Sequence, residues 1–287
     1  MKKFLAIAAT AALIVGMLSG CGAKDKAEEA VSEAKEVVEE AAPELEVIKV
    51  GATPAPHAEI LKEATPLMAE KGYSLEIVEF TDYVQPNSNL ESGDIDANYF
   101  QHTPYLDDFN AENGTHIVPV AAIHYEPLGL YPGKTATIEE LADGASIAVP
   151  NDTTNEARAL LLLAANGIIE INEDAGLKAT KLDITSNPLN IEIVEMEAAQ
   201  LARTLQDVDM AVINGNYAIQ ADLNAETDAI AKEEKDSLAA ETYANVLCVK
   251  EGNEEDPRVK ALIEVLTSDE IKTFIEDNYQ GAVVPMF

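Results

Sequence analysis

From Glu46 onward, short apolar runs alternate with amphipathic segments, and this alternation constrains the fold more than any other feature of the chain. The apolar runs, several of them rich in Val and Ile, predict strands. The segments between them repeat apolar residues at helical spacing and end at glycines such as Gly72 and Gly114. Strands are expected at 46–52, 74–80, 94–100 and 116–123, and helices at 57–72 and 103–114. Strands and helices in alternation indicate an α/β fold with a largely parallel sheet.

The pattern breaks between Leu128 and Gly144, where Gly, Pro and a short predicted helix interrupt it, and then resumes. The second stretch predicts strands at 145–150, 191–196 and 210–215, and helices at 154–167 and 198–207. A long apolar strand at 243–250 then leads into two closing amphipathic helices. This late return of the chain predicts a bilobed protein with a cleft. Residues 46–137 and 243–287 are expected to form the first lobe, and residues 138–242 the second.

The N-terminus has the pattern of an export signal. Lys2 and Lys3 precede an apolar run that is too short for a comfortable membrane span. "LSGC", ending at Cys21, resembles the bacterial lipobox, so residues 1–20 are expected to be a lipoprotein signal peptide and Cys21 the lipidated first residue of the mature chain. The alternative is a plain signal peptide with an incidental Cys. Residues 21–45 then comprise the lipidated Cys and an acidic tether to the folded part.

Charge and cysteine content limit the possible partners. The net charge of −33 disfavours nucleic acid, which is recognised by a basic face, and direct adsorption to anionic headgroups. Membrane attachment must therefore come from acyl chains, palmitate among them, on Cys21. Lipidation of Cys21 leaves Cys248 without an intramolecular partner, so we expect Cys248 to be a small buried hydrophobe.

Enzyme and metal motifs are mostly missing from the sequence. We find no G-x-S-x-G elbow, P-loop, H-E-x-x-H or C-x-x-C. The four histidines are scattered, and no two are spaced as a helical metal site requires. His124 and Glu126 remain a possible metal pair, but the sequence favours neither a metal nor a cofactor. We therefore expect a protein that is not an enzyme.

Arg158 is unusual among the three arginines. Arg203 and Arg258 have acidic residues at helical spacing, whereas Arg158 has none, in a chain with 52 acidic residues. It lies one turn inside the helix that begins at "NDTTNEAR", so its guanidinium is expected near free backbone N–H groups. Asn155 lies in the same turn. Together these groups indicate a carboxylate receptor, and the alternative is a salt bridge between the lobes to a distant acid.

Two further clusters follow predicted strands. Asn214 and Asn216 come after a buried apolar strand, where an open α/β sheet gathers its ligands, although an Asn-Gly-Asn turn also caps helices. Eight of the fifteen Phe and Tyr residues fall between Phe80 and Tyr131. The aromatic candidates that follow strand ends are Tyr83, Phe100 and Tyr105, together with His102. An aromatic wall facing Arg and Asn suits an α-amino acid with an apolar side chain, although core packing is the usual role of any single aromatic.

Six motifs in order carry a resemblance to a known family. They are "VGATPAPHAEIL", "FTDYVQPN", "DANYFQHTPYL", "VPNDTTNEARALLLL", "IEIVEMEAAQLARTL" and "VINGNYA". Together they resemble the methionine-binding lipoproteins of the NlpA/MetQ type, the substrate-binding components of methionine ABC importers. The resemblance runs from about Glu46 to the C-terminal "GAVVPMF" and so covers nearly all of the mature chain.

The resemblance implies a periplasmic-binding-protein fold, type II-like, whose two α/β lobes close on free methionine. It implies that Arg158 holds the ligand carboxylate and that Asn214 helps to hold the amino-acid head. The residues implied for the side-chain pocket are Tyr83, Phe100, His102 and Tyr105, which match the family's aromatic motifs. Tyr99, where relatives often carry a small residue, is bulky enough that it could reshape the pocket.

The partners implied by the resemblance are methionine, the permease and ATPase of an importer, and the membrane through the lipid anchor. The location implied is the extracytoplasmic face of the cell membrane. Two alternatives stay open at this point. One is a binder of a methionine-containing dipeptide or another small apolar amino acid, and the other is a surface adhesin with an incidental cleft.

Overall fold

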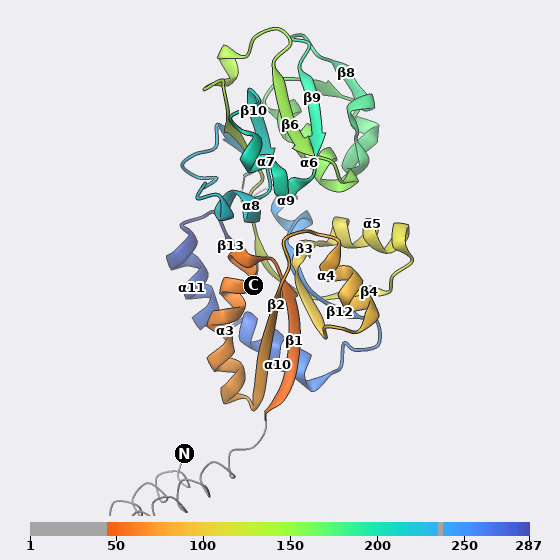
Figure 1. Ribbon diagram of the computed structural model, residues 1–287, viewed down its shortest axis with the longest axis vertical. Helices are drawn as coiled ribbons and strands as arrows, with labels where there is room; N and C mark the ends of the chain where they lie inside the picture. The colour runs from red at the N-terminus through yellow and green to blue at the C-terminus, as the bar shows by residue number, and fades with distance from the viewer. Residues whose placement is uncertain (1–44, 235–237) are drawn as a thin grey trace, which may run out of the picture. The chain divides into compact units, whose positions relative to one another are not determined.

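The computed structural model describes residues 45–234 and 238–287, which fold around two β-sheets (Figure 1). The predicted signal peptide, Cys21 and all but the last residue of the predicted tether lie outside the described residues. Within the described part, no helix combines the length and the apolar character that crossing a bilayer requires.

The first sheet has six strands in the order β13-β4-β12-β3-β1-β2. Their bounds are Glu46–Ala52 (β1), Tyr73–Glu79 (β2), Ala97–His102 (β3), Ile117–Tyr125 (β4), Asn245–Lys250 (β12) and Val284–Pro285 (β13). β1 pairs in parallel with β2 and β3, as the alternating pattern predicts. The expectation of a largely parallel sheet is wrong for the strands on the other side of β3, because β12 is antiparallel to both β3 and β4. The returning chain enters this sheet at Asn245, opposite the end of β3 at His102, and therefore runs against its neighbours.

Helices cover both faces of the first sheet (Figure 1). On one face α3 (Glu59–Glu70), α10 (Pro257–Leu266) and α11 (Asp269–Tyr279) pack into one apolar core. On the other face α4 (Gln85–Ser92) and α5 (Thr103–Asn113) bury a smaller cluster. That cluster contains Cys248, fully buried with a free thiol, as expected of a small hydrophobe. A short π-helical turn, η1 (Pro54–Ala58), follows β1.

The second sheet has the order β11-β5-β10-β6-β9. Its strands are Gly129–Pro132 (β5), Ser146–Pro150 (β6), Glu192–Met196 (β9), Met210–Ile213 (β10) and Ala231–Lys232 (β11). α6 (Thr153–Ala165) packs on one face, and α7 (Ala198–Thr204) and α8 (Gly215–Gln220) pack on the other. This part of the chain also contains a small hairpin, β7 (Glu170–Ile171) with β8 (Ile184–Ser186), and α9 (Leu238–Thr242). Three short 3₁₀ turns complete it: η2 (Ile138–Glu140), η3 (Glu173–Lys178) and η4 (Lys181–Asp183).

The change from one sheet to the other comes earlier than the expected boundary at residues 137 and 138. β5 pairs with β10 and β11 in the second sheet, so the crossover lies between Tyr125 and Gly129. The run "GLYP" is four residues long and contains Gly and Pro, which is why it reads as a break in the pattern rather than as a strand. The protein is thus a bilobed α/β fold in which each lobe is built on one sheet.

Candidate ligand-binding site

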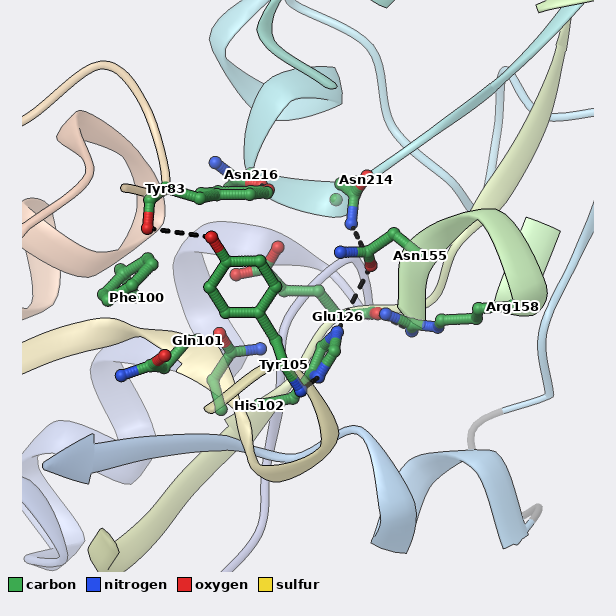
Figure 2. A pocket seen from close by; sticks show the side chains of 12 residues that line it. Tyr83, Phe100, Gln101, His102, Tyr105, Glu126, Asn155, Arg158, Asn214 and Asn216 are labelled. Carbon is green, nitrogen blue, oxygen red and sulfur yellow. Dashed lines mark hydrogen bonds between the residues drawn. The ribbon is translucent and has the colours of Figure 1, made fainter. Parts of the chain in front are cut away.

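A small cavity lies where strands of both sheets meet the segments that follow them (Figure 2). Its lining is Tyr83, Phe100, Gln101, His102, Tyr105, Glu126, Asn155, Arg158, Asn214, Gly215, Asn216 and Asn245. All seven ligand-binding residues predicted from the sequence are in this lining. Its volume is ≈ 20 Å³, enough for about one water molecule. An amino acid enters this site only if the side chains of the two lobes first move apart.

The first lobe contributes an aromatic wall. The ring centroid of Tyr83 lies 5.9 Å from that of Phe100 and 5.7 Å from that of Tyr105. Phe100 lies near the end of β3, and Tyr105 lies in the first turn of α5. The hydroxyl of Tyr105 donates to the carbonyl of Tyr83 at 3.0 Å, which holds the loop after β2 against α5. These contacts make a preformed apolar surface on one side of the cavity.

A chain of polar groups crosses from the first lobe to the second. The Nε2 atom of His102, at the start of α5, lies 3.2 Å from Oδ1 of Asn155 on α6. The same Oδ1 accepts from Nδ2 of Asn214 at 2.8 Å. Burial, and then the nearby charge of Arg158, lower the pKa of His102 to about 3, so this imidazole is neutral at pH 7. A neutral ring can donate from Nε2 to Asn155 while its Nδ1 accepts the backbone N–H of Tyr105 at 3.2 Å.

The start of α8 carries two buried polar atoms without hydrogen-bond partners: Oδ1 of Asn214, the N-cap residue, is an acceptor, and Nδ2 of Asn216, in the first turn, is a donor. The rest of each amide is used, because Nδ2 of Asn214 donates to Asn155 and Oδ1 of Asn216 accepts from the hydroxyl of Tyr83 at 2.6 Å. A buried polar group left unsatisfied costs about 1–3 kcal/mol. The cavity is therefore suited to a small molecule that carries both a donor and an acceptor.

Arg158 points into the same region, but its guanidinium already has an acidic partner. Nε lies 2.8 Å from Oε1 of Glu233, and Nη2 lies 2.5 Å from Oε2 of Glu233 and 3.0 Å from the carbonyl oxygen of Glu126. Burial alone would raise the pKa of Glu233, but the charge and hydrogen bonds of Arg158 hold that pKa below its usual range. Glu233 directly follows β11 in the second sheet, so this ion pair lies within one lobe and not between two. The described hydrogen bonds use Nε and Nη2 of Arg158 and leave Nη1 out.

The prediction that Arg158 lies near free backbone N–H groups at the start of α6 is wrong for the N–H of Asn155, which already has a hydrogen-bond partner. The carboxylate of Asp152 is the N-cap of α6 and accepts from the backbone N–H of Asn155 at 3.0 Å and from its Nδ2 at 2.9 Å. Asp152 thereby satisfies the helix and fixes the Asn155 amide in one orientation. The sequence contained this signal, since Asp is a favoured N-cap residue.

Tyr99 does not reshape the cavity, contrary to what its size suggested. Its side chain is fully buried in the core of the first lobe, and its hydroxyl contacts Nδ1 of His124. Neighbours along a strand point to opposite faces, so Phe100 faces the cavity side while Tyr99 faces the core. The cavity also contains Gln101, Glu126, Gly215 and Asn245, which the sequence did not single out as ligand-binding residues.

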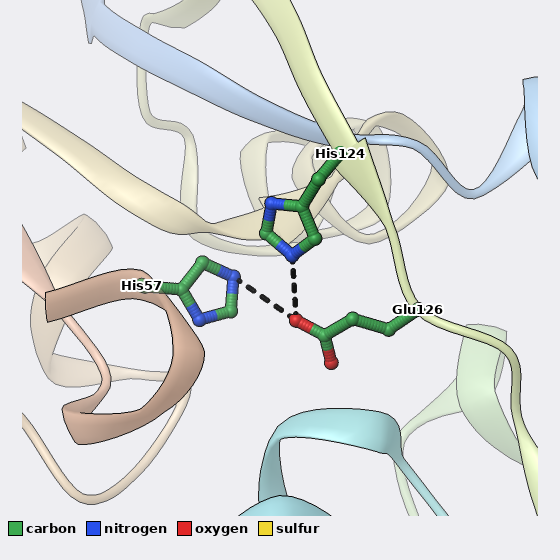
Figure 3. Close-up of side chains that lie close together, drawn as sticks. All are labelled: His57, His124 and Glu126. Atoms are coloured by element: carbon green, nitrogen blue, oxygen red, sulfur yellow. Dashed lines mark hydrogen bonds and ion pairs between the residues drawn. The ribbon is translucent and has the colours of Figure 1, made fainter. Parts of the chain in front are cut away.

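His57, His124 and Glu126 form a cluster just behind the cavity (Figure 3). Nε2 of His124 lies 2.7 Å from Oε1 of Glu126, and Nε2 of His57 lies 3.5 Å from the same oxygen. Two ligands of one zinc ion lie about 3.3 Å apart, given metal–ligand distances of about 2.0–2.2 Å. The separation between His124 and Glu126 is that of a hydrogen bond. Burial lowers the pKa of both imidazoles, to about 4 for His57 and about 3 for His124, which keeps them neutral at pH 7.

Comparison with known proteins agrees with the motif pattern. The chain is 39% identical over 290 residues to the "Methionine-binding lipoprotein MetQ" of Bacillus subtilis, covering 100% of this chain and 99% of the relative. A crystal structure of a putative lipoprotein from Ruminococcus gnavus matches with 55% identity and a TM-score of 0.84, covering 84% of this chain and 100% of the other.

A nutrient-binding protein from Burkholderia cenocepacia, solved bound to methionine, matches with 43% identity and a TM-score of 0.80, covering 84% of this chain and 100% of the other. The model of the NlpA lipoprotein family matches residues 48–287. This match spans both sheets and every residue that lines the cavity. The chain belongs to the NlpA lipoprotein family.

Proposed function

We propose that this protein is a lipid-anchored extracytoplasmic solute-binding protein that captures methionine and delivers it to an ABC importer. The observation that carries the proposal is the pair of unsatisfied amide atoms on Asn214 and Asn216, which lie between an arginine and an aromatic wall. An α-amino acid supplies both of the missing partners. Its ammonium group donates to Oδ1 of Asn214, and its carboxylate accepts from Nδ2 of Asn216.

Charges around the cavity suit the two ends of such a ligand. Nη1 of Arg158, which the hydrogen bonds to Glu233 leave out, is assigned to the ligand carboxylate. The carboxylate of Glu126, also in the lining, is assigned to the ammonium group. Glu126 and Arg158 are both buried, so these contacts form in a region from which water is largely excluded.

The aromatic wall suits a thioether side chain. Tyr83, Phe100 and Tyr105 lie with ring centroids about 6 Å apart, leaving edges and faces that a flexible sulfur-containing chain can contact. Contacts between sulfur and aromatic rings contribute about 0.3–1.5 kcal/mol each. The names of the relatives support this ligand class, since one is a methionine-binding lipoprotein and another was solved with methionine bound.

Attachment to the membrane is assigned to acyl chains on Cys21, which would also keep the protein near a permease and its ATPase. Mass spectrometry of the mature N-terminus tests this assignment. We expect a peptide that begins with diacylated or triacylated Cys21, and an unmodified peptide that begins elsewhere would contradict it. The family supports binding rather than turnover, and we propose no catalytic residue.

A panel of ligands in calorimetry and thermal-shift assays tests the function itself. The panel is L-methionine, D-methionine, norleucine, glycyl-methionine and methioninol, which lacks the carboxylate. Before the assays, the purified protein is unfolded, dialysed and refolded to remove any retained ligand. We expect L-methionine to raise Tm most among the single amino acids, with methioninol much weaker. A clear preference for glycyl-methionine would favour the dipeptide alternative, and no shift with any ligand would favour the adhesin.

A further inference from the structure

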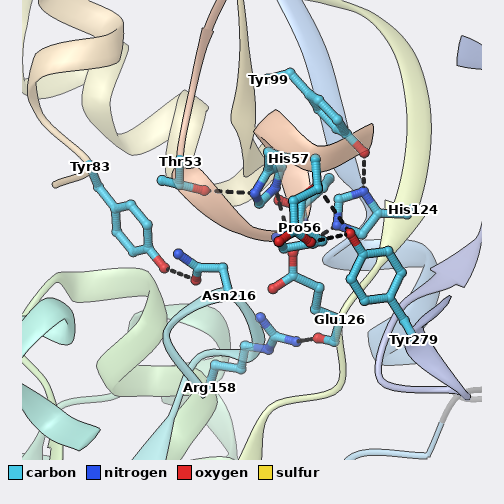
Figure 4. A network of polar contacts seen from close by, with 12 residues as sticks. Thr53, Pro56, His57, Tyr83, Tyr99, His124, Glu126, Arg158, Asn216 and Tyr279 are labelled. Carbon is cyan, nitrogen blue, oxygen red and sulfur yellow. Dashed lines mark hydrogen bonds and ion pairs between the residues drawn. The ribbon is translucent and has the colours of Figure 1, made fainter. Parts of the chain in front are cut away.

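Two polar residues of the cavity lining, Asn245 and Glu126, contact imidazoles that are not part of the lining. Figure 4 shows the imidazoles of His57 and His124 beside Glu126. His57 lies on the turn Pro54–Ala58 after β1 and is fully buried. Its Nε2 atom lies 3.0 Å from Oδ1 of Asn245 and 3.5 Å from Oε1 of Glu126. His57 and Asn245 are 188 residues apart in the sequence, so only the folded first lobe brings them together.

The surroundings of His57 fix the position of its proton. Burial raises the pKa of Glu126, which the charge of Arg158 opposes. When Glu126 is ionised its oxygens only accept, so the nitrogen that faces Oε1 then carries the hydrogen. His57 is thus in the Nε2–H form, and its unprotonated Nδ1 accepts from the hydroxyl of Thr53 at 2.7 Å. The Nε2–H group then requires an acceptor from Asn245. The amide oxygen must face His57, because the reverse orientation would bring two donors together.

With its oxygen turned toward His57, the amide of Asn245 directs its NH₂ group away from the imidazole. We infer that His57 is a positioning residue that fixes the Asn245 amide so that its NH₂ group donates to the carboxylate of the bound amino acid. The inference rests on the proposed function for the identity of the ligand. It does not need the ligand for the hydrogen bond between His57 and Asn245, which exists in the closed cavity already.

A second imidazole, that of His124, allows the effect of His57 on Asn245 to be separated from its effect on Glu126. His124 donates from Nε2 to Oε1 of Glu126 at 2.7 Å, and its Nδ1 contacts the hydroxyl of Tyr99. Glu126 therefore keeps a close donor when His57 is removed, whereas among the described side-chain hydrogen bonds His57 is the one that holds Asn245. A loss of methionine affinity on replacing His57 should therefore arise mainly because the Asn245 amide is no longer held in one orientation.

The first experiment uses the ligand-free protein. Long-range ¹H–¹⁵N correlation spectra, assigned by comparison with His57→Gln, report which ring nitrogen carries the proton. We expect the neutral Nε2–H form of His57 at pH 7. An Nδ1–H form would overturn the inference, whatever the protein binds.

The second experiment is a double-mutant cycle on methionine affinity. His57→Leu fills a similar volume but has no N–H, and we expect it to raise Kd about tenfold, as for the loss of a hydrogen bond to a charged group. In the Asn245→Ala background the same change should alter Kd less than twofold, because the group that His57 positions is already absent. His57→Gln, which can offer an amide N–H in place of the imidazole, should remain within about threefold of the unmodified protein.

A purely structural role for His57 predicts a different outcome. Leu262→Ala removes a fully buried side chain from the core of the same lobe and should lower Tm while leaving Kd unchanged. If His57→Leu behaves like Leu262→Ala, or raises Kd equally in both backgrounds, the inference is wrong. If the unmodified protein does not bind methionine, the proposed function fails, and the ring-nitrogen measurement still decides the role of His57.

Discussion

Both carboxylate oxygens of Glu233 accept hydrogen bonds from the guanidinium of Arg158, Oε1 from Nε at 2.8 Å and Oε2 from Nη2 at 2.5 Å. Both side chains are at least nine-tenths buried. A ligand bound as proposed would therefore contact Arg158 as part of an ion pair and not as a free positive charge. The guanidinium of Arg158 also stacks on Tyr243, whose ring centroid lies 4.2 Å from Cζ of Arg158. The cavity thus gains a fixed, oriented donor without a net charge that must be neutralised before closure.

Replacing Arg158 should abolish most of the affinity for an amino acid. We expect Arg158→Ala to cost about 2–5 kcal/mol of binding free energy, because a charged donor is lost in a region that excludes water. Titration calorimetry measures the change directly. Arg203→Ala, which removes an exposed arginine on α7, is the matched control and should leave the affinity unchanged. Equal affinities in the Arg158 variant and the unmodified protein would remove Arg158 from the site.

Replacing Glu233, the partner of Arg158, should lower the stability of the protein but raise its affinity for methionine. Glu233→Gln leaves a buried guanidinium without its counter-charge, which typically costs about 3–5 kcal/mol of stability. A ligand carboxylate can then take the place of Glu233, so methionine should bind more tightly and raise Tm by a larger increment than in the unmodified protein. Thermal melts with and without ligand measure both effects. A smaller ligand increment in the variant would show that Glu233 supports the ligand rather than competing with it.

The hydroxyl of Tyr83 joins the two lobes through Asn216 at 2.6 Å. Tyr83→Phe keeps the aromatic wall but leaves Oδ1 of Asn216 without this donor, so the closed form loses a hydrogen bond. We expect Kd to rise about tenfold, mainly through faster release, in line with an unsatisfied buried acceptor. Stopped-flow measurement of release rates is the test, and Tyr73→Phe, at the start of β2 and outside the cavity lining, is the control.

Gly215 allows the close approach of the two lobes at Glu126. A Cβ at this position would lie 2.6 Å from Cβ and 2.7 Å from Oε2 of Glu126, closer than carbon atoms tolerate. We expect Gly215→Ala to hold the lobes apart and raise Kd at least tenfold, which calorimetry measures. Gly51→Ala meets Ile95 at the same 2.6 Å but outside the cavity lining, so it should lower Tm without a comparable change in Kd. Similar affinity losses in both variants would point to a general packing defect.

Glu156, which is not part of the cavity lining, should make the stability of the protein depend on pH. Burial raises its pKa from 4.5 to about 7; the N–H of Lys181 opposes this shift, and a hydrogen bond with Glu195 adds to it. An acid whose pKa is raised by folding favours the folded state below its unfolded pKa, and that contribution is lost as the pH rises through the folded value. Stability linked to Glu156 should therefore decline between pH 4.5 and about 7.

Glu156→Gln removes the ionisation but keeps an oxygen for the N–H of Lys181, which donates to Glu156 at 3.0 Å. We expect the variant to melt higher than the unmodified protein at pH 8, by about 2–4 °C for each kcal/mol recovered, and to match it near pH 4.5. Thermal melts across this pH range measure the difference. A constant difference at every pH would show that Glu156 does not titrate in this range.

Several features of the site were readable from local sequence. The aromatic residues after β3 and the Asn-Gly-Asn turn after β10 follow strand ends, and strand ends of one sheet converge on one edge. That rule placed Phe100 and His102 at the edge of the first sheet and Asn214 at the edge of the second, and the predicted cleft between the lobes made the two edges face each other. Arg158 stood out because none of the positions three or four residues from it holds an acid. The true partner, Glu233, is 75 residues away and directly follows β11, a strand of two residues with no strong sequence pattern.

The sequence by itself determined most of the longer helices and strands, because their patterns depend on residues a few positions apart. It also predicted seven residues that line the cavity. Only the tertiary structure decided that β12 runs antiparallel into the first sheet, that Tyr99 faces the core, and that His57 contacts Asn245 across 188 residues. Such contacts depend on how distant segments pack, and no local pattern records the geometry of that packing.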